Sequence, residues 1–300
     1  MTPHPRGFLL DGKALSETIQ AEIAEQVNEM KKKGRKVPHL AAVLVGSDGA
    51  SETYVSHKVK ACERVGFAST LRRFPDTTTE QELLEAIDEL NNDPQIDGFI
   101  VQLPLPRHIR VDKVLERISP AKDVDGFHPM NTGRMVANLP AYKPATPDGI
   151  VEMINRFNIP TRGRHVVVIG RSLIVGTPIS LLLSREGYPG DATVTLCHRY
   201  TEGLANYTRT ADILIVAVGI PGFVTADMIK EGATVIDVGI TRVADESKKS
   251  GFSLKGDVDF EGVKPKAAFI TPVPGGVGPM TIASLLKNTL LAAKGAVYGK

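Results

Sequence analysis

The feature that most constrains the fold is an alternation of short, β-branched apolar runs with longer segments of helical periodicity. In the second half of the chain, "HVVVIG" (165–170) precedes the helical pattern "TPISLLLSREG" (177–187), and "ATVTLC" (192–197) forms the next apolar run. The first half shows the same order, with "HLAAVLVG" (39–46) between two helical segments. Such alternation predicts an α/β fold with parallel strands covered by helices, and ligands beyond the carboxyl ends of the strands.

A chain of 300 residues exceeds the usual size of one hydrophobic core. Proline, glycine and polar residues interrupt the alternation, which places a domain junction near Pro144–Gly149. We therefore expect an N-terminal α/β catalytic domain (1–147 plus 279–300) and a Rossmann-like, doubly wound nucleotide-binding domain (148–278), with a cleft between them. The terminal helical segment (280–296) follows a glycine-proline loop and is expected to pack back on the first domain.

Charge and cysteine usage exclude several classes of protein. The 36 basic residues nearly balance the 34 acidic ones, and they are scattered, so neither a nucleic acid nor a membrane surface is an expected partner. Cys62 and Cys197 lie far apart without a metal-binding spacing, which predicts neither a disulfide nor a metal site.

The start lacks the apolar run of a signal peptide, and no window approaches the roughly 18 apolar residues of a membrane span. We expect a cytoplasmic protein.

The run "VVVIGRSLIVGTPISLLL" (166–183) is the strongest candidate for a nucleotide site. It reads as a strand, a glycine turn and a helix, the layout in which backbone amides and a helix N-terminus hold a phosphate. Gly170 and Gly176 are six residues apart, so the G-x-G-x-x-G fingerprint is absent and an ordinary tight turn remains an alternative. The candidate cofactor-binding residues of this turn are Gly170, Arg171, Ser172 and Gly176.

The end of the next strand distinguishes between the nicotinamide cofactors. An acid there usually binds the ribose 2′-hydroxyl of NAD, whereas an arginine accepts the 2′-phosphate of NADP. His198 and Arg199 stand at this end, and Arg171 can join them, so NADP is favoured. Asp191, just before the strand, leaves NAD possible, since an acid with a metal and inorganic phosphate could fill the same space.

Two later turns and one stiff loop complete the candidate cofactor side. "AVGIPG" and "DVGIT" place Gly219, and Gly239 with Ile240, after buried strands, where the backbone can approach a flat cofactor. The run "TPVPGGVGPMT" combines prolines and glycines immediately before a helix. The residues expected to line the nicotinamide and substrate side of the cleft are Pro274, Gly275 and Gly276.

The stretch "SETYVSHKVK" raises the question of catalysis. If Ser51 caps this helix, Tyr54 and Lys58 lie four residues apart on one face, while His57 and Lys60 point elsewhere. A solvated helix surface would show the same pattern. Gln102, a long polar side chain, ends an apolar strand in the same half of the chain, at the edge of the sheet where ligands are expected. Its position favours the catalytic interpretation.

Gln102 closes the apolar strand within "DGFIVQLPLP", and the loop "KDVDGFHP" adds carboxylates at Asp123 and Asp125. A plain turn with local hydrogen bonds is the alternative for both aspartates. A lysine serves as an acid or base near neutral pH only where burial or neighbours lower its pKa from about 10.4 towards roughly 7 to 8. Lys58 beside an apolar strand end could meet that condition, with the Gln102 oxygen orienting its amine.

These motifs resemble the family of bifunctional methylenetetrahydrofolate dehydrogenase/methenyltetrahydrofolate cyclohydrolases. The resemblance runs along nearly the whole chain, through "SETYVSHKVKAC", "DGFIVQLPLP", "KDVDGFHPMNTGRM", "PATPDG", "GRHVVVIGRSLIVGTP", "DATVTLCHR", "VIDVGI" and "TPVPGGVGPMT". It implies that Tyr54 stacks on the pterin and that Lys58 is the catalytic acid/base. Gln102 would tune the lysine, and Asp125 would grip the pterin ring. Family members often carry cysteine where Ala145 stands, so no thiol chemistry is expected there.

The resemblance implies oxidation of 5,10-methylenetetrahydrofolate with NADP⁺, followed by hydrolysis of the methenyl product to 10-formyltetrahydrofolate. A tetrahydrofolate one-carbon substrate and a homodimer, formed through the second domain, are the expected partners. Two alternatives stay open, namely a dehydrogenase without cyclohydrolase activity and a non-catalytic nucleotide-binding module. NAD in place of NADP also remains open, because some members of this family use it.

Overall fold

The computed structural model describes residues 6–248 and 251–299, apart from the side chain of Ala50. The chain divides into two compact units, and each combines two stretches of sequence. Unit 1 consists of Met1–Ser16 and Thr146–Thr281, and unit 2 of Glu17–Ala145 and Ile282–Lys300. None of the helices in the described ranges is long and apolar enough to cross a membrane.

The chain passes from one unit to the other after Ser16, after Ala145 and after Thr281. The second passage lies inside the interval in which we placed the domain junction. The first was not foreseen, because we assigned residues 1–16 to the N-terminal domain. They belong to unit 1 because β1 (Phe8–Leu9) pairs in parallel with β11 (Phe269–Ile270).

Unit 1 is built on a six-stranded sheet in which all neighbours are parallel and the order is β1-β11-β8-β7-β5-β6. In this order β6 lies on one side of β5 and β7 lies on the other, so the strand order reverses between β5 and β7. In doubly wound sheets, ligands bind beyond the carboxyl ends of the strands at this reversal. The inner strands are β5 (His165–Ile169), β6 (Thr193–Cys197), β7 (Ile213–Val216) and β8 (Thr234–Asp237).

Helices cover this sheet because its strands are apolar on both faces. Val167, Leu214 and Val235 belong to one buried cluster, against which Leu204 and Phe260 pack from outside the sheet. Removal of such fully buried side chains from water is the main stabilising term of the unit. The helical segments of unit 1 are α6 (Ala145–Arg156), α7 (Gly176–Ser184), α8 (Leu204–Thr208), the 3-10 turn η1 (Ala226–Met228) and α9 (Phe260–Val263).

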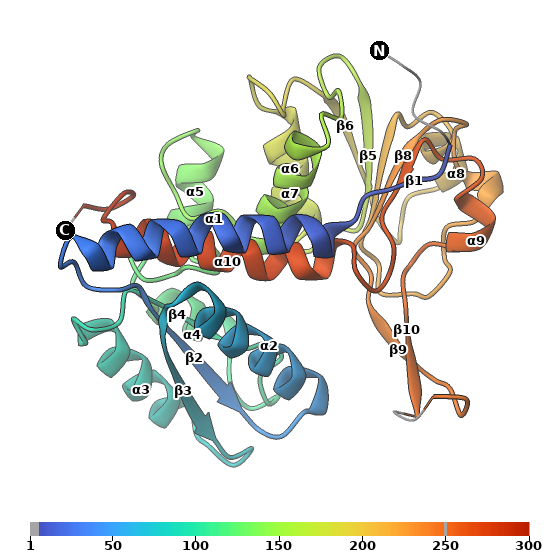
Figure 1. Cartoon of the computed structure of the whole chain (residues 1–300). Coiled ribbons are helices and arrows are strands. Elements are labelled where there is room, and N and C mark those ends of the chain that lie inside the picture. Colours follow the sequence, from blue (N-terminus) through green and yellow to red (C-terminus); the bar gives the residue numbers. More distant parts are fainter. Residues whose placement is uncertain (1–5, 249–250, 300) are drawn as a thin grey trace. The chain divides into compact units, whose positions relative to one another are not determined.

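A two-stranded antiparallel hairpin projects from unit 1 (Figure 1). It consists of β9 (Thr241–Ala244) and β10 (Phe252–Lys255), which pair with each other and form a sheet separate from the six-stranded one. The sequence did not predict it, because "TRVADESKKSGFSLK" is polar and charged like a surface loop.

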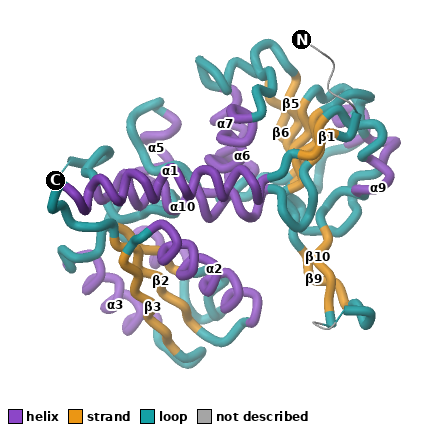
Figure 2. Tube along the Cα trace, in the orientation of Figure 1, coloured by secondary structure: helices purple, strands orange, loops and turns teal. Residues whose placement is uncertain are grey.

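Unit 2 contains a three-stranded parallel sheet in the order β3-β2-β4. Alternate residues of the central strand pack on opposite faces, and Ala41, Val43 and Val45 share a buried cluster with Leu83 and Ile87 of α3. Figure 2 shows α2 and α3 on opposite sides of β2 and β3. The strands are β2 (His39–Val45), β3 (Ala68–Phe74) and β4 (Gly98–Val101). The helices with residues in unit 2 are α1 (Gly12–Lys32), α2 (Gly49–Val65), α3 (Glu80–Asn92), α4 (Val111–Arg117), α5 (Pro129–Val136) and α10 (Val277–Ala293).

The class predicted from the sequence, a two-domain α/β protein with a Rossmann-like sheet, is confirmed. Helix α6 begins at Ala145, and Pro147 lies in its first turn, where no backbone N–H is needed. Strand β4 stops at Val101, one residue before the predicted end at Gln102, and the prolines of "LPLP" follow.

Candidate active site

Helix α2 presents the predicted catalytic lysine, but its cap is a different residue from the one predicted. Asp48 is the N-cap, and its Oδ2 accepts hydrogen bonds from the backbone N of Ser51 at 2.8 Å and from Ser51 Oγ at 2.9 Å. The prediction that Ser51 caps the helix is therefore wrong. Ser51 lies inside the first turn, buried, because "SDGA" supplies an acid one turn earlier.

The two residues that the four-residue spacing places on one face of α2 differ in exposure. Lys58 is only 9% exposed, whereas Tyr54, one turn earlier, is 38% exposed. His57 and Lys60 are exposed. A lysine is seldom buried without a partner, so the position of Lys58 requires one.

Gln102 is that partner. Its backbone N donates to Val43 O at 2.9 Å, which holds it at the carboxyl end of β4. Lys58 Nζ donates to Gln102 Oε1 at 3.1 Å, and Gln102 Nε2 donates to Leu103 O at 2.8 Å. The second bond fixes the orientation of the amide, because only the nitrogen can donate to a carbonyl. The oxygen of Gln102 is thus held towards the lysine.

Burial sets the protonation of this group. Burial lowers the pKa of Lys58, and the negative charge of Asp125 opposes that shift. Burial raises the pKa of Asp125, and the charge of Lys58 opposes it. Both shifts favour neutral forms, so the amine can lose its proton far more readily than an exposed lysine can. A buried base next to a carboxyl group is the arrangement expected of acid/base catalysis.

Asp123, the other acid of the loop, has a structural role. Its carboxylate accepts hydrogen bonds from Phe127 N at 3.2 Å, His128 N at 2.8 Å and Asn131 Nδ2 at 2.9 Å. Burial raises the pKa of Asp123 to about 7. Asp123 therefore stabilises the turn that contains Asp125. For Asp123, the structure fits the alternative of a plain turn with local hydrogen bonds.

The glycine turn of unit 1 joins β5 to α7 at the point where the strand order reverses. Gly170 has φ 113°, and a Cβ on it would lie 2.2 Å from Ala217 O. A Cβ on Gly176 would lie 1.8 Å from Gly170 O. Both positions therefore require glycine, and the backbone can approach a ligand without side chains intervening. Between them, the Ser172 hydroxyl accepts hydrogen bonds from the backbone amides of residues 175 and 176 at 3.1 and 3.4 Å.

Strand β6 brings a histidine and an arginine to the same edge of the sheet, because it lies next to β5. His198 directly follows β6, and the exposed guanidinium of Arg199 lies 4.8 Å from the centre of the Tyr200 ring. Arg171 is also exposed. Asp191 lies before β6, at the opposite end of the strand, where its Oδ1 accepts from Gly187 N at 3.0 Å. The carboxyl edge thus carries cations and backbone amides, which suits a 2′-phosphate.

The remaining predicted cofactor residues follow neighbouring strands of the same sheet. Gly219 comes after β7, with φ 72°, and Gly239 and Ile240 come after β8. Gly219 is exposed, and Ile240 is 40% exposed. An exposed glycine backbone and an exposed apolar side chain can contact a flat nicotinamide dinucleotide. The arginines that follow β5 and β6 can bind its phosphates.

The proline-glycine run lies in unit 1, packed against the start of α1. Lys13 N donates to Gly275 O at 2.9 Å, and a Cβ on Gly12 would lie 1.9 Å from Gly276 O. Pro274 is exposed in the same turn. The structure therefore groups the predicted residues in two sets. Unit 2 contains Ser51, Tyr54, Lys58, Gln102 and Asp125, and unit 1 contains the others.

Together these features define an α/β enzyme that combines a nicotinamide-nucleotide sheet with a second unit carrying a buried lysine. Family models agree with this class. The catalytic-domain model of the tetrahydrofolate dehydrogenase/cyclohydrolases matches residues 10–125, and the model of their NAD(P)-binding domain matches residues 144–297. The chain belongs to the tetrahydrofolate dehydrogenase/cyclohydrolase family.

Individual relatives are similar over almost their whole length. A protein of Flavobacterium johnsoniae named bifunctional protein FolD is 62% identical over 286 residues, which is 95% of this chain and 97% of the relative. The crystal structure of the bifunctional FolD enzyme of Campylobacter jejuni is 47% identical, with a TM-score of 0.90 over 96% of this chain and 99% of that one. The Trypanosoma brucei enzyme, solved with NADP cofactor and an inhibitor, is 39% identical, with a TM-score of 0.93 over 98% of this chain and 99% of that one.

Proposed function

We propose that this protein oxidises 5,10-methylenetetrahydrofolate to the 5,10-methenyl form with NADP⁺ and hydrolyses the product to 10-formyltetrahydrofolate. The observation that carries the proposal is the buried amine nitrogen of Lys58, 3.1 Å from the Gln102 oxygen at the end of β4. Similar proteins bear names that include both activities, and one was solved with NADP.

Lys58 acts in the hydrolytic step. The methenyl carbon is electrophilic, and water becomes an effective nucleophile when a base takes its proton. Neutral Lys58 accepts that proton and returns it to the ring nitrogen when the carbon–nitrogen bond breaks, and the remaining hydroxyl proton leaves to water as the formyl C=O forms. Burial lowers the pKa of Lys58, so more of its amine is neutral than in an exposed lysine at the same pH.

Gln102 and Tyr54 orient the reacting groups. The amide of Gln102 is held by Leu103 O, so its oxygen fixes the direction of the Lys58 amine. Tyr54 lies one turn before Lys58 and offers an exposed flat ring for the pterin. Asp125 presents a carboxyl group to the donor edge of the aminopyrimidine, a grip that fixes the substrate and reduces the entropic barrier.

Unit 1 holds the cofactor. Gly170 and Gly176 bring backbone amides to its phosphates, and Arg171, His198 and Arg199 favour NADP through its 2′-phosphate. When bound, NADP⁺ supplies the acceptor for the hydride that leaves the methylene carbon. The protein contributes orientation, with Gly219, Gly239 and Ile240 offering open backbone and an apolar surface.

A lysine pair on one helix tests the catalytic assignment. Lys58→Met in the full chain should lower methenyl hydrolysis, followed without cofactor, by about 10²–10⁴-fold. Lys60→Met removes an exposed lysine from the same helix and should hydrolyse at the parent rate. Hydrolysis at the parent rate by Lys58→Met would disprove the role of Lys58. A parent protein that reduces NADP⁺ without hydrolysing methenyl substrate would be a monofunctional dehydrogenase, and one that binds no tetrahydrofolate would be only a nucleotide-binding module.

The assembly and compartment of the protein are part of the same proposal. The hairpin β9–β10 has open edges in unit 1, and a two-stranded sheet alone is marginally stable. We expect a homodimer that covers this hairpin, so sedimentation should give a mass near twice 32.3 kDa. Cys62 and Cys197 are free and buried, which suits a reducing cytoplasm.

A further inference from the structure

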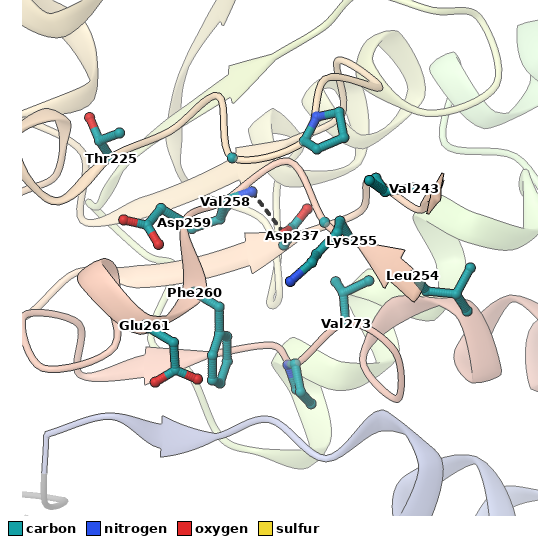
Figure 3. Close-up of a pocket in the computed structure, with 14 residues that line it drawn as sticks. Thr225, Asp237, Val243, Leu254, Lys255, Val258, Asp259, Phe260, Glu261 and Val273 are labelled. Carbon is teal, nitrogen blue, oxygen red and sulfur yellow. Dashed lines mark hydrogen bonds between the residues drawn. The ribbon is translucent and has the colours of Figure 1, made fainter. Parts of the chain in front are cut away.

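Two aspartates are buried near the carboxyl edge of the unit 1 sheet, and the sequence predicted no role for them. Asp237 is the last residue of β8 and is 3% exposed, and Asp257 follows β10 and is 0% exposed. Asp237 also borders a hollow of about 730 Å³ next to β10, drawn in Figure 3. Burying one carboxylate is unfavourable, and burying two in one place is more so, which raises the question of what they hold.

Asp257 holds the loop that follows β7. Its Oδ2 accepts hydrogen bonds from Val218 N at 2.7 Å and from Gly219 N at 2.9 Å. Its Oδ1 is buried and accepts no hydrogen bond from any residue that the structure describes. Two backbone amides on one charged oxygen form a strong and directional contact, so the carboxylate fixes the direction of this exposed loop.

The other side of Asp257 meets the loop that follows β8. A Cβ on Gly239 would lie 2.1 Å from the carboxylate carbon of Asp257 and 2.2 Å from Oδ1. The Gly239 hydrogen in that place points at the carboxylate, which is the arrangement of a weak Cα–H···O contact. Gly239 is therefore required by the carboxylate behind it, and Asp257 contacts the loops after both β7 and β8.

The Asp237 carboxylate holds the backbone on either side of this contact. Its Oδ1 accepts from Asp257 N at 2.9 Å and from Gly239 N at 3.0 Å. Its Oδ2 accepts from Val258 N at 2.9 Å, the bond drawn as a dashed line in Figure 3. Burial raises the pKa of Asp237 to about 6, and the charge of Asp257 adds to that shift. The two aspartates hold these amides in place. Burying their charge is unfavourable, and an apolar core would not carry that cost.

We infer that Asp257 is a positioning residue for the nicotinamide cofactor, acting through the loops that contain Gly219 and Gly239. This inference rests on the proposed function, because it takes those loops to contact NADP⁺. The loops follow adjacent strands, β7 and β8, on the reversal side of the sheet, and Asp257 is the group that ties one to the other. Loss of its carboxylate releases the amides of Val218 and Gly219 and removes the contact with Gly239, whose backbone N keeps its bond to Asp237. Cofactor binding weakens, while the lysine of unit 2 keeps its contacts.

Three variants of the full chain test the inference. In Asp257→Ala, the dissociation constant of NADP⁺ by calorimetry and its KM in the dehydrogenase assay should each rise by about tenfold or more, since two charge-assisted hydrogen bonds are lost. Asp257→Asn keeps one oxygen that can accept from both amides, so its values should fall between those of Asp257→Ala and the parent. Glu261→Gln removes an exposed acid of the same segment and should match the parent. Methenyl hydrolysis without cofactor should change by less than about twofold in all three.

The readouts separate the possible results. A parent-like NADP⁺ affinity in Asp257→Ala, an equal fall of hydrolysis and dehydrogenation, or an Asp257→Asn as weak as Asp257→Ala would each overturn the positioning role. If Asp257→Ala does not fold, Asp257→Asn is compared with the parent instead. A raised KM for NADP⁺ with unchanged methenyl hydrolysis would support the positioning role, and any other result would contradict it. Absence of both activities in the parent protein would instead reject the proposed function, so the two failures are distinguishable.

Discussion

The Lys58–Gln102 contact yields a prediction that separates charge from shape. Gln102→Glu replaces the amide with a carboxylate of nearly the same size, which keeps an oxygen for Lys58 but loses the hydrogen bond that Nε2 donates to Leu103 O. The parent amide accepts from Lys58 Nζ at 3.1 Å without carrying a charge. In the variant, a negative charge stands at that distance and favours the protonated amine. The sign is therefore a higher pKa for Lys58 and less neutral lysine at any given pH.

The size of the effect follows from the distance. Two unit charges 3.1 Å apart attract by about 5 kcal/mol at an effective dielectric constant of about 20. The buried carboxylate loses solvation, so half of that value, about 2 to 3 kcal/mol, is a safer expectation. This still reduces the fraction of neutral lysine by about 30- to 150-fold. Methenyl hydrolysis at neutral pH should fall by a similar factor.

The assay is hydrolysis of methenyl substrate without cofactor, measured from neutral to alkaline pH and corrected for the spontaneous reaction. The loss should shrink as pH rises, because alkali removes the proton that the new carboxylate retains. Dehydrogenation should fall less than hydrolysis, since it does not need a neutral lysine. A Gln102→Glu enzyme that hydrolyses at the parent rate at neutral pH would refute the reasoning, as would a loss that is equal at all pH values.

Three further predictions address the acid, the glycine turn and the cofactor. Asp125→Asn removes the charge that raises the pKa of Lys58, so the rising limb of the hydrolysis–pH profile should move to lower pH, and a move to higher pH would contradict the assignment. Gly170→Ala should lower the melting temperature and weaken NADP⁺ binding, because its Cβ would lie 2.2 Å from a backbone oxygen, whereas Gly163→Ala, at φ 68° with open space around it, should retain binding. Arg199→Ser should raise the KM for NADP⁺ about tenfold and leave that for NAD⁺ unchanged; equal changes would exclude a 2′-phosphate contact.

The strand and helix alternation could be predicted because apolar runs and helical spacing are local properties. The apolar runs at 39–46, 165–170 and 192–197 contain β2, β5 and β6. The hairpin β9–β10 could not be predicted, because its stability depends on partners rather than on an apolar pattern. The helix cap at Asp48 was missed because Ser51 is an equally good capping residue by type, and only the backbone decides which one starts the helix.

Within the site, the sequence could name Lys58 and its partner Gln102, but their burial and contact could be established only from the structure. The four-residue spacing of Tyr54 and Lys58 is common on surface helices, and only burial and the Gln102 oxygen distinguish this one. Asp257 left no signal, since one aspartate after a short polar strand is typical of a turn. Its importance depends on amides almost forty residues earlier in the chain, a contact that no local pattern encodes.

The amide of Asn288 on α10 has a consequence for how the protein is made. Its Nδ2 donates to Val124 O and to Lys143 O, each at 2.9 Å, and so closes the loop that carries Asp125. The ribosome adds Asn288 only after β2, β3, β4 and the whole of unit 1 have been translated. A nascent chain can therefore assemble both sheets before Asn288 is translated, and the loop that carries Asp125 gains these two hydrogen bonds only afterwards.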